Sequence, residues 1–296
     1  MRALPALVLL ATLAPLAHAE PKLFFDDFQY TDRQAMAAKG WIVRTGSGWP
    51  GVEGAQFWAD GVRVIADPAD KNNRLLQLRA ATDGTAKGTR QAQLCHARKY
   101  LEGTYAARVR FHDAPVSGPD GDPIVETFYL ISPLKAPKDP DYSEADFEYL
   151  PNGGWGSNGA YFYATTWETF IPAPNFWKDN QYDRVAGSQE GWHTLVLTIA
   201  GQQVNYFLDG KPFARHGGDY YPEVPMSINF NLWFTGLASL GPARREYQQE
   251  VDWVLHVKDE VLTPAQVNEQ VKTLRGAKVP FRDTVPTRGL PSPCNL

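Results

Sequence analysis

The feature that most constrains the fold is a repeated alternation of apolar and polar residues between Leu23 and Trp253, in short segments bounded by Gly, Pro and Asp. A period of two is typical of strands, whereas helices repeat apolar residues every three or four positions. Asp209-Gly210 also supplies a hairpin turn signal. We therefore predict an all-β fold, an antiparallel two-sheet sandwich. Its clearest strands are residues 75–79, 105–111, 124–131, 194–199 and 204–208.

Both ends of the chain depart from this pattern. Residues 1–19 combine a basic start, an apolar run and a small-residue end, which is typical of a secretory signal peptide. The run is shorter than the ~20 apolar residues of a membrane span. We predict one sandwich domain over residues 20–258, then a short helix and a Pro-rich tail over residues 259–296. Thr263, Pro264 and Gln266 form the predicted start of that helix.

The chain contains two cysteines, Cys95 and Cys294. Export into an oxidising compartment would allow a disulfide that ties the tail to the body. Two free thiols are an equal alternative, because the sequence does not show whether the two Cα atoms lie within about 7 Å.

A net charge of −4 limits the partners of this chain. It lacks the positive field by which proteins hold nucleic acid, an anionic membrane or a sulfated polymer. The histidines show no metal-ligand spacing, and no Gly-x-Ser-x-Gly elbow or phosphate-binding glycine loop is found in the sequence. The sequence therefore favours a neutral partner and gives no support to metal hydrolysis, serine hydrolysis or nucleotide chemistry.

Three acids alternate with apolar residues in the segment Ser143 to Glu148. In a strand, Glu144, Asp146 and Glu148 project from one face. The backbones of the two glutamates lie about 13 Å apart, so their side chains can lean to the ~5.5 Å separation of a retaining glycosidase. Crowded like charges keep one carboxyl protonated while another stays ionised. A solvated strand face is the alternative, but like charges on one face destabilise a strand.

Aromatic side chains supply the rest of a predicted sugar site. Pyranose rings present apolar C–H faces that pack on Trp and Tyr, while the hydroxyl groups need polar partners. Core packing is the alternative for each Trp, and we expect it for Trp192 and Trp253. The candidate sugar platforms are Trp155, Trp167, Trp177 and Trp233.

The segment Glu144 to Glu148 resembles the Glu-x-Asp-x-Glu signature of glycoside hydrolase family 16, in the form that has no extra residue before the last Glu. Other segments resemble the family in the same order along the chain. These are Phe25-Asp26-Asp27-Phe28, Gly103 to Val109, Gly191-Trp192-His193-Thr194, Tyr206 to Gly210, Asn229 to Trp233, and Val251 to Val254.

The resemblance implies a concanavalin A-like jelly roll with the substrate across its concave sheet, and retaining hydrolysis of a β-linked glucan. By motif position, Glu144 is the nucleophile, Asp146 the assisting acid and Glu148 the acid/base. It also implies that Asp252 lies where some members bind a structural calcium; no other cofactor is expected. The implied substrate-binding residues are Trp155, Trp167, His193, Asn231 and Trp233.

Two departures from the family pattern bear on the substrate. The stretch Leu195 to Ile199 has no Trp after the His-Thr element, and residues 133–142 form an insertion before the acid strand. We predict a secreted, monomeric endo-hydrolase of a neutral polysaccharide, β-1,3-1,4- or β-1,3-glucan. Three alternatives remain: a transglycosylase using the same acids, a lectin-like binding protein without turnover, and an enzyme for a charged galactan, which the composition does not favour.

Overall fold

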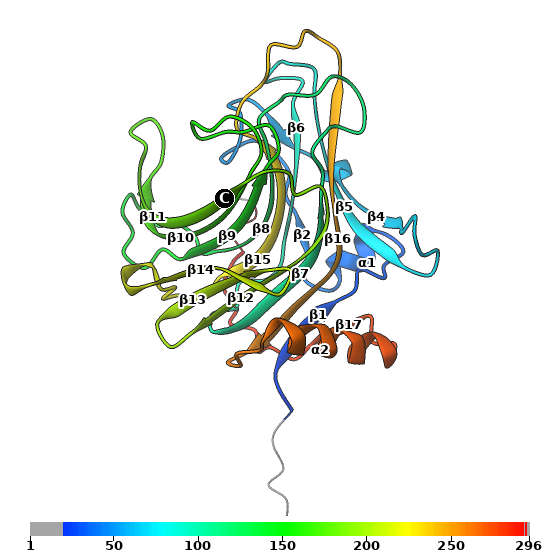
Figure 1. The fold of residues 1–296 in the computed structure, drawn as a ribbon, viewed down its shortest axis with the longest axis vertical. Coiled ribbons are helices and arrows are strands. Elements are labelled where there is room, and N and C mark those ends of the chain that lie inside the picture. The colour runs from blue at the N-terminus through cyan, green and yellow to red at the C-terminus, as the bar shows by residue number, and fades with distance from the viewer. Residues whose placement is uncertain (1–19, 293, 295–296) are drawn as a thin grey trace, which may run out of the picture.

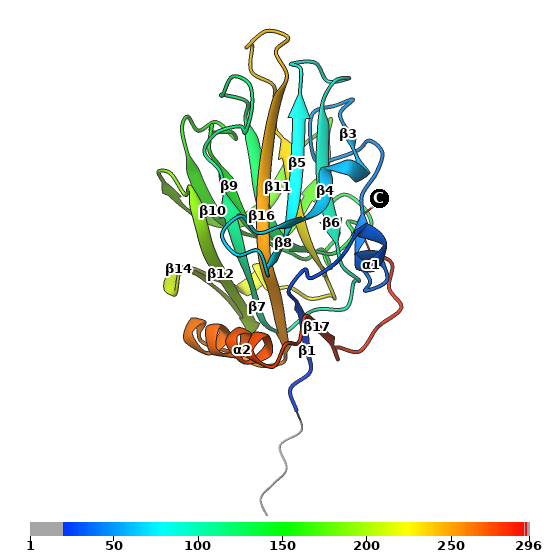
Figure 2. The same ribbon diagram turned by 90° about the vertical axis from the view of Figure 1, so that its right-hand side faces the viewer.

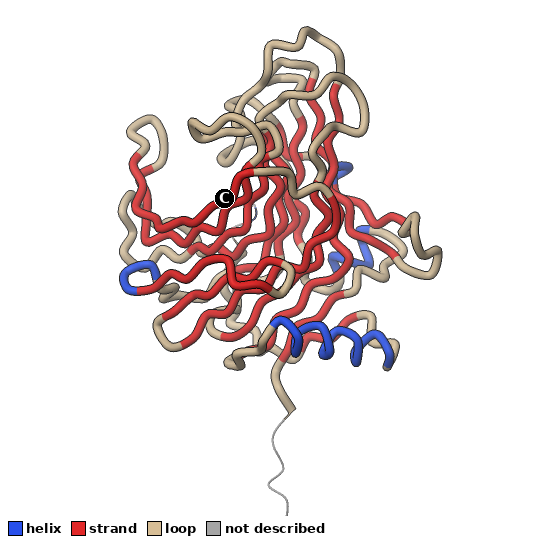
Figure 3. Tube along the Cα trace, in the orientation of Figure 1, coloured by secondary structure: helices blue, strands red, loops and turns tan. Residues whose placement is uncertain are grey.

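The computed structural model describes residues 20–292 and residue 294 and consists of two packed antiparallel sheets (Figures 1 and 3). This confirms the predicted all-β sandwich, and the predicted signal peptide lies outside the described residues. The front sheet contains, in spatial order, β2 (Ile42–Val43), β6 (Arg90–Cys95), β15 (Ser227–Phe234), β8 (Ile124–Ile131), β9 (Glu144–Leu150), β10 (Tyr161–Ile171) and β11 (Trp177–Ala186).

The second sheet, which we call the back sheet, packs face to face against the front sheet across the hydrophobic core. Its spatial order is β4 (Val62–Ala66), β5 (Arg74–Thr82), β16 (Arg245–Lys258), β7 (Gly103–Phe111), β12 (Gly191–Ala200), β13 (Gln203–Leu208) and β14 (Lys211–Gly217). The short β3 (Gln56–Phe57) pairs with β6, which also touches β5 and so joins the two sheets. Short helical turns complete the chain: α1 (Arg33–Ala37), η1 (Ala59–Gly61) and η2 (Gly218–Tyr220).

The core forms because one side of each strand alternation is apolar. Phe128, Phe147 and Phe230 stack across three neighbouring strands of the front sheet, and Tyr206 of the back sheet meets Phe147 edge-on. All four side chains are fully buried, and each such burial contributes about 1.5–3 kcal/mol. The five strands that the sequence predicts all form, and the Asp209-Gly210 turn has positive φ at both residues, as a type I′ turn requires.

The C-terminal region packs on the back sheet (Figure 2). Helix α2 (Pro264–Gly276) begins with the expected capping box between Thr263 and Gln266, and its Val267, Val271 and Leu274 are buried against that sheet. The tail is not only an extended arm, because β17 (Phe281–Asp283) pairs with β1 (Leu23–Asp26), which itself pairs with β16. Among the described residues, no helix is long and apolar enough to span a membrane.

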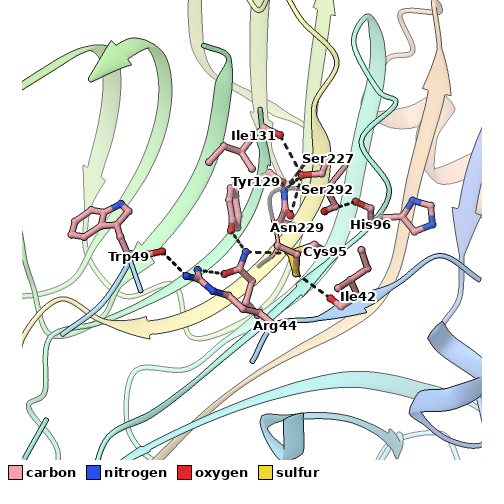
Figure 4. Close-up of a disulfide and its surroundings, with 12 residues drawn as sticks. Ile42, Arg44, Trp49, Cys95, His96, Tyr129, Ile131, Ser227, Asn229 and Ser292 are labelled. Atoms are coloured by element: carbon pink, nitrogen blue, oxygen red, sulfur yellow. Dashed lines mark hydrogen bonds between the residues drawn. A yellow bond between two sulfur atoms is a disulfide. The ribbon is translucent and has the colours of Figure 1, made fainter. Parts of the chain in front are cut away.

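The two cysteines form a disulfide. Cys95 at the end of β6 bonds to Cys294, with Cα atoms 5.7 Å apart, across 199 residues of sequence. Of the two alternatives that the sequence leaves open, the structure has the disulfide, which fastens the tail to β6, the strand next to β2 in the front sheet (Figure 4).

Candidate active site

The three acids of β9 lie on one face of the front sheet. Ala145, Phe147 and Tyr149 point into the core and are fully buried. The acids point the other way, to what we call the acid face of the front sheet. Glu144 and Glu148 are partly exposed there, whereas only 3% of Asp146 is exposed. The alternation that the sequence predicts thus sorts the acids from the apolar residues.

Strand pairing places other side chains beside each acid. Paired residues on adjacent strands project from the same face, with Cβ atoms about 5 Å apart. The acids are each flanked by one residue of β8 and one of β10. The flanking pairs are Ile131 and Trp167 for Glu144, Tyr129 and Thr165 for Asp146, and Thr127 and Tyr163 for Glu148.

Two hydrogen-bond donors hold the first two acids. The Tyr142 hydroxyl donates to Glu144 Oε2, and Trp167 Nε1 donates to Asp146 Oδ2 at 2.8 Å. The other oxygen of this aspartate, Oδ1, is buried and has no hydrogen-bond partner among the described residues. A buried carboxylate oxygen without a donor disfavours the ionised form, so Asp146 is placed to keep a proton.

Burial and mutual repulsion raise the pKa values of all three acids. Burial raises the pKa of Glu144 to about 7, against the pull of the Tyr142 hydrogen bond. Burial and the charge of Glu144 raise the pKa of Glu148 to about 8, partly offset by Lys178. The pKa of Asp146 is raised well above its usual range by burial and then by both glutamates. Both glutamates therefore titrate close to neutral pH, so that one of them can be ionised while the other carries a proton.

Polar side chains extend the acid face toward β15 and β6. Asn231 pairs with Thr127 on one side and Gln93 on the other, and its buried Oδ1 has no hydrogen-bond partner within residues 20–292. Gln93 donates to the Tyr129 hydroxyl at 2.9 Å and accepts from Arg44 at 2.9 Å (Figure 4). An unpaired buried amide oxygen favours a hydroxyl donor from outside the chain, so Asn231 fits its predicted substrate-binding role.

Three of the four predicted aromatic platforms lie along the acid face, whereas Trp177 shares the opposite face of β11 with Asp179 and packs against Lys138. Trp233 is only 6% exposed and contacts Trp49, a ring that is 61% exposed, at 6.1 Å between centroids. Trp155 is 47% exposed and meets Tyr163 edge-on. Trp167 serves mainly as the donor to Asp146. These positions leave Trp49 and Trp155 as the rings that sugar can reach most easily.

His193 does not lie on the acid face. It belongs to β12 of the back sheet, where its ring packs on Phe111. Its Nδ1 is 2.8 Å from Asp209 Oδ2 and its Nε2 is 3.1 Å from the Gln189 carbonyl. Both ring nitrogens are thus used within the fold, away from the acid face, so the sugar-binding role of His193 stays a prediction that its position does not favour. The family resemblance placed the segment of His193 in order along the chain, but it did not show to which sheet this residue belongs.

The surroundings of Asp252 do not fit a calcium ion. Its Oδ1 accepts from Arg275 at 2.7 Å and from Asn73 at 2.8 Å, and its Oδ2 accepts from Arg108 at 2.8 Å. Guanidinium groups therefore occupy the positions that a cation would need. No group of three His, Cys, Asp or Glu suited to a metal occurs in residues 20–292. Both carboxylate oxygens of Asp252 thus accept from arginines of the chain, and a structural calcium there stays a prediction that these contacts do not favour.

Sequence reasoning missed Tyr142, Trp49 and Arg44. Tyr142 ends the insertion at residues 133–142, and it precedes Glu144 by two positions, so extending the strand alternation backwards would have placed it on the acid face. Trp49 and Arg44 lie in a loop and come to the acid face through Trp233 and Gln93, about 180 and 50 residues further along the chain. No local pattern reports such contacts.

Comparison with known proteins gives one family match. The family described as "Glycosyl hydrolases family 16" matches residues 64–255, which include the whole acid row. Among curated proteins, Crh-like protein 4 of Aspergillus fumigatus is 28% identical over 100 residues, a match that covers 32% of this chain and 21% of that protein. The chain thus spans about a fifth of the length of this curated relative.

Solved structures with the same fold include two glucanases. A Bacteroides ovatus family 16 protein, from a mixed-linkage glucan locus and in complex with a G4G4G3G product, aligns with a TM-score of 0.58 at 18% identity, covering 78% of this chain and 98% of that one. A Bacillus licheniformis β-glucanase aligns with a TM-score of 0.55 at 13% identity, covering 81% and 100%. At these identities the likeness shows the fold.

Proposed function

The chain belongs to glycosyl hydrolase family 16, and from this premise we propose that it is a retaining endo-hydrolase of a β-linked polysaccharide. The first candidate substrates are β-1,3-1,4- and β-1,3-glucan. The observation that carries the proposal is the acid row, in which two glutamates on one face have pKa values of about 7 and about 8. One of them can act as a base or nucleophile while the other acts as an acid.

In the proposed first step, the Glu144 carboxylate attacks the anomeric carbon. The bond from that carbon to the glycosidic oxygen breaks as Glu148 gives its proton to the leaving oxygen. The products of this step are a glycosyl ester on Glu144 and a sugar chain with a new hydroxyl. Trp167 and Tyr142 keep the first two acids in position during the attack.

In the proposed second step, Glu148 acts as a base. It takes a proton from a water molecule, whose oxygen attacks the anomeric carbon and releases Glu144 as a carboxylate. Two inversions at one carbon leave its configuration unchanged. Asp146 is buried between the two glutamates, and the pKa of its carboxyl is raised. It would therefore hold a proton close to Glu144 and limit the negative charge of the three acids.

The test uses Glu144→Gln on soluble β-1,3-1,4- and β-1,3-glucan. We expect release of reducing ends to fall at least about 1000-fold, because the amide cannot form the ester. Glu269→Gln on the exposed side of α2 is the matched control and should retain full activity. Proton NMR of the first products should show the β anomer. Unchanged activity of Glu144→Gln, or α-anomeric products, would refute the assigned roles.

The same assays separate the alternatives. A transglycosylase would give products longer than the substrate when oligosaccharide is added, because an acceptor sugar takes the place of water. A lectin-like protein would bind glucan and release no reducing ends from any of the substrates.

We further propose that the protein is secreted as a monomer after removal of residues 1–19. N-terminal sequencing of exported protein should then begin at Glu20, and sedimentation should give the mass of one chain.

A further inference from the structure

The two flanks of the acid face differ in charge. On the side of β15 and β6, the residues beside the acids are the amides of Asn231 and Gln93 and the ring of Trp233. The cation on that side, Arg44, is buried and donates to Gln93 and to the Trp49 carbonyl. On the other side lies β11, the edge strand of the front sheet (Figure 1). Its residues on the acid face include Lys178 and Arg184. A chain whose net charge is −4 thus has two cations along one border of its acid row.

Alternation along β11 sorts charges between its two faces. Lys178, Tyr182 and Arg184 share the acid face, as the pairing of β11 with β10 requires. The acidic residues of the same strand point the other way, toward β14 and η2. Asp183 accepts from His216 at 3.1 Å, and Asp179 accepts from the Tyr220 hydroxyl at 3.0 Å. The aspartates are therefore used on the far side and do not neutralise the cations.

Both cations lie against aromatic rings. Lys178 Nζ lies 5.8 Å from the Trp167 ring and 5.6 Å from the Tyr182 ring, and the Arg184 guanidinium lies 4.7 Å from the Tyr161 ring. Within the described part of the chain, neither forms an ion pair with a carboxylate. A cation held on rings keeps its charge available to an external anion. The rings beside it can also receive the apolar face of a sugar.

The cations lie within reach of a chain bound over the acids. Arg184 shares a register row with Tyr163 and Glu148, so it lies two strands, or about 10 Å, from the acid/base. A polysaccharide laid across the strands of the front sheet would pass over both. The acid row repels an anionic polymer, and the exposed cations Lys178 and Arg184 offset that repulsion, whereas Arg44 on the other flank is buried.

We propose that Lys178 and Arg184 bind an anionic substituent, a carboxylate or a sulfate ester, on the polysaccharide one or two sugar units from the bond that is cleaved. This inference rests on the proposed function and narrows its substrate from a neutral glucan to an acidic derivative. It also revises the expectation, drawn from overall composition, that the partner is neutral: total charge does not report how charges are distributed over one strand.

The test measures binding in the Glu144→Gln background, so that turnover does not interfere. The probes are three β-1,3-glucan oligosaccharides of equal length: hydroxyethylated, carboxymethylated and sulfated. We expect an acidic oligosaccharide to bind about tenfold more tightly than the hydroxyethylated one, since two exposed charge contacts are each worth a few-fold. Raising ionic strength from 0.01 to 1 M, which shortens the screening length from about 30 Å to about 3 Å, should remove the difference.

Variants assign the effect to β11. Lys178→Gln with Arg184→Gln should abolish the preference, while Lys272→Gln with Arg288→Gln, which removes one Lys and one Arg elsewhere, should keep it. Equal binding of all three probes, or a preference that the first pair leaves intact, would overturn the inference. If the inference fails in this way but the parent protein still cleaves the hydroxyethylated glucan, the proposed function is kept. If binding depends on charge but the parent protein cleaves none of the probes, the inference is kept and the proposed function is refuted.

Discussion

Two buried aspartates, one on each sheet, show opposite ways of using a carboxylate. Asp146 on the front sheet is 3% exposed and has two glutamates and one indole donor beside it, and its pKa is raised well above the usual range. Asp252 on the back sheet is 1% exposed; burial alone would raise its pKa, but hydrogen bonds from Arg275 lower it. The two aspartates are almost equally buried, yet the pKa of one is raised and that of the other is lowered. The neighbouring side chains, acids at Asp146 and arginines at Asp252, determine the direction.

The difference separates stability from chemistry within one fold. At Asp252, two guanidinium groups tie α2 to β16 and β7, so the charge strengthens the packing. At Asp146, no described residue forms an ion pair with the row, although Lys178 lowers the pKa of Glu148, and the crowding of the three acids raises their pKa values. Each of the following predictions tests one side of this contrast.

The largest effect on stability is expected from Arg275→Met. The change leaves Asp27 and Asp252 buried without their shared cation, which should lower the free energy of unfolding by about 3–5 kcal/mol. Urea denaturation measures the loss, with Lys272→Met on the exposed face of α2 as the control. Activity per folded molecule should not change. An unchanged urea midpoint would show that the contacts of Arg275 with Asp27 and Asp252 do not stabilise the fold.

Asp146→Asn should affect activity and leave stability nearly unchanged. Activity should fall about 100-fold, because the amide cannot exchange a proton with the glutamates. The unfolding free energy at pH 8 should change little, because Asp146 already holds its proton there and the amide replaces one neutral group by another. Asp252→Asn is the matched comparison and should lose stability while keeping activity. If both variants lost stability at pH 8, the contrast between the two aspartates would fail.

The pH dependence of stability gives a third, smaller effect. The folded-state pKa values of Glu144 and Glu148, about 7 and about 8, exceed the unfolded value near 4.5. The stability that their protonation brings is complete below pH 4.5 and is lost as pH rises through 7 and 8. Allowing for solvent access, the loss should be about 1–2 kcal/mol. Chemical denaturation from pH 4.5 to 8.5 should show this fall, and Glu144→Gln with Glu148→Gln should reduce it, leaving the part due to other buried acids such as Asp26 and Asp27.

The smallest effect is expected from Tyr142→Phe. Removing the donor to Glu144 should raise the pKa of that carboxyl, moving the acid limb of the kcat/KM profile from near 7 to a higher pH, with the limb near 8 little changed. At pH 7 activity should fall about tenfold, because a single hydrogen bond to a charged group is worth about 1.5 kcal/mol. A kcat/KM profile that keeps its shape but is lower at every pH would indicate that Tyr142 only packs against the site.

The sequence predicts what depends on local spacing. The period of two placed Glu144, Asp146 and Glu148 on one face, and the capping residues at Thr263 and Gln266 located the start of α2. It could not give contacts across long separations. The pairing of Asp252 with Arg108, the packing of Trp49 on Trp233 and the sheet to which His193 belongs all depend on how distant segments fold together.

The covalent link between Cys95 and Cys294 encloses β7 to β17 in a closed ring, and the acid row and Asp252 lie inside that ring. In the exported setting proposed here, the protein would meet proteases. A single cut in any loop of the ring would leave the two fragments joined, and the sheets that hold β9 would stay assembled. Nicked protein would then migrate as one band without reductant and as two bands with it.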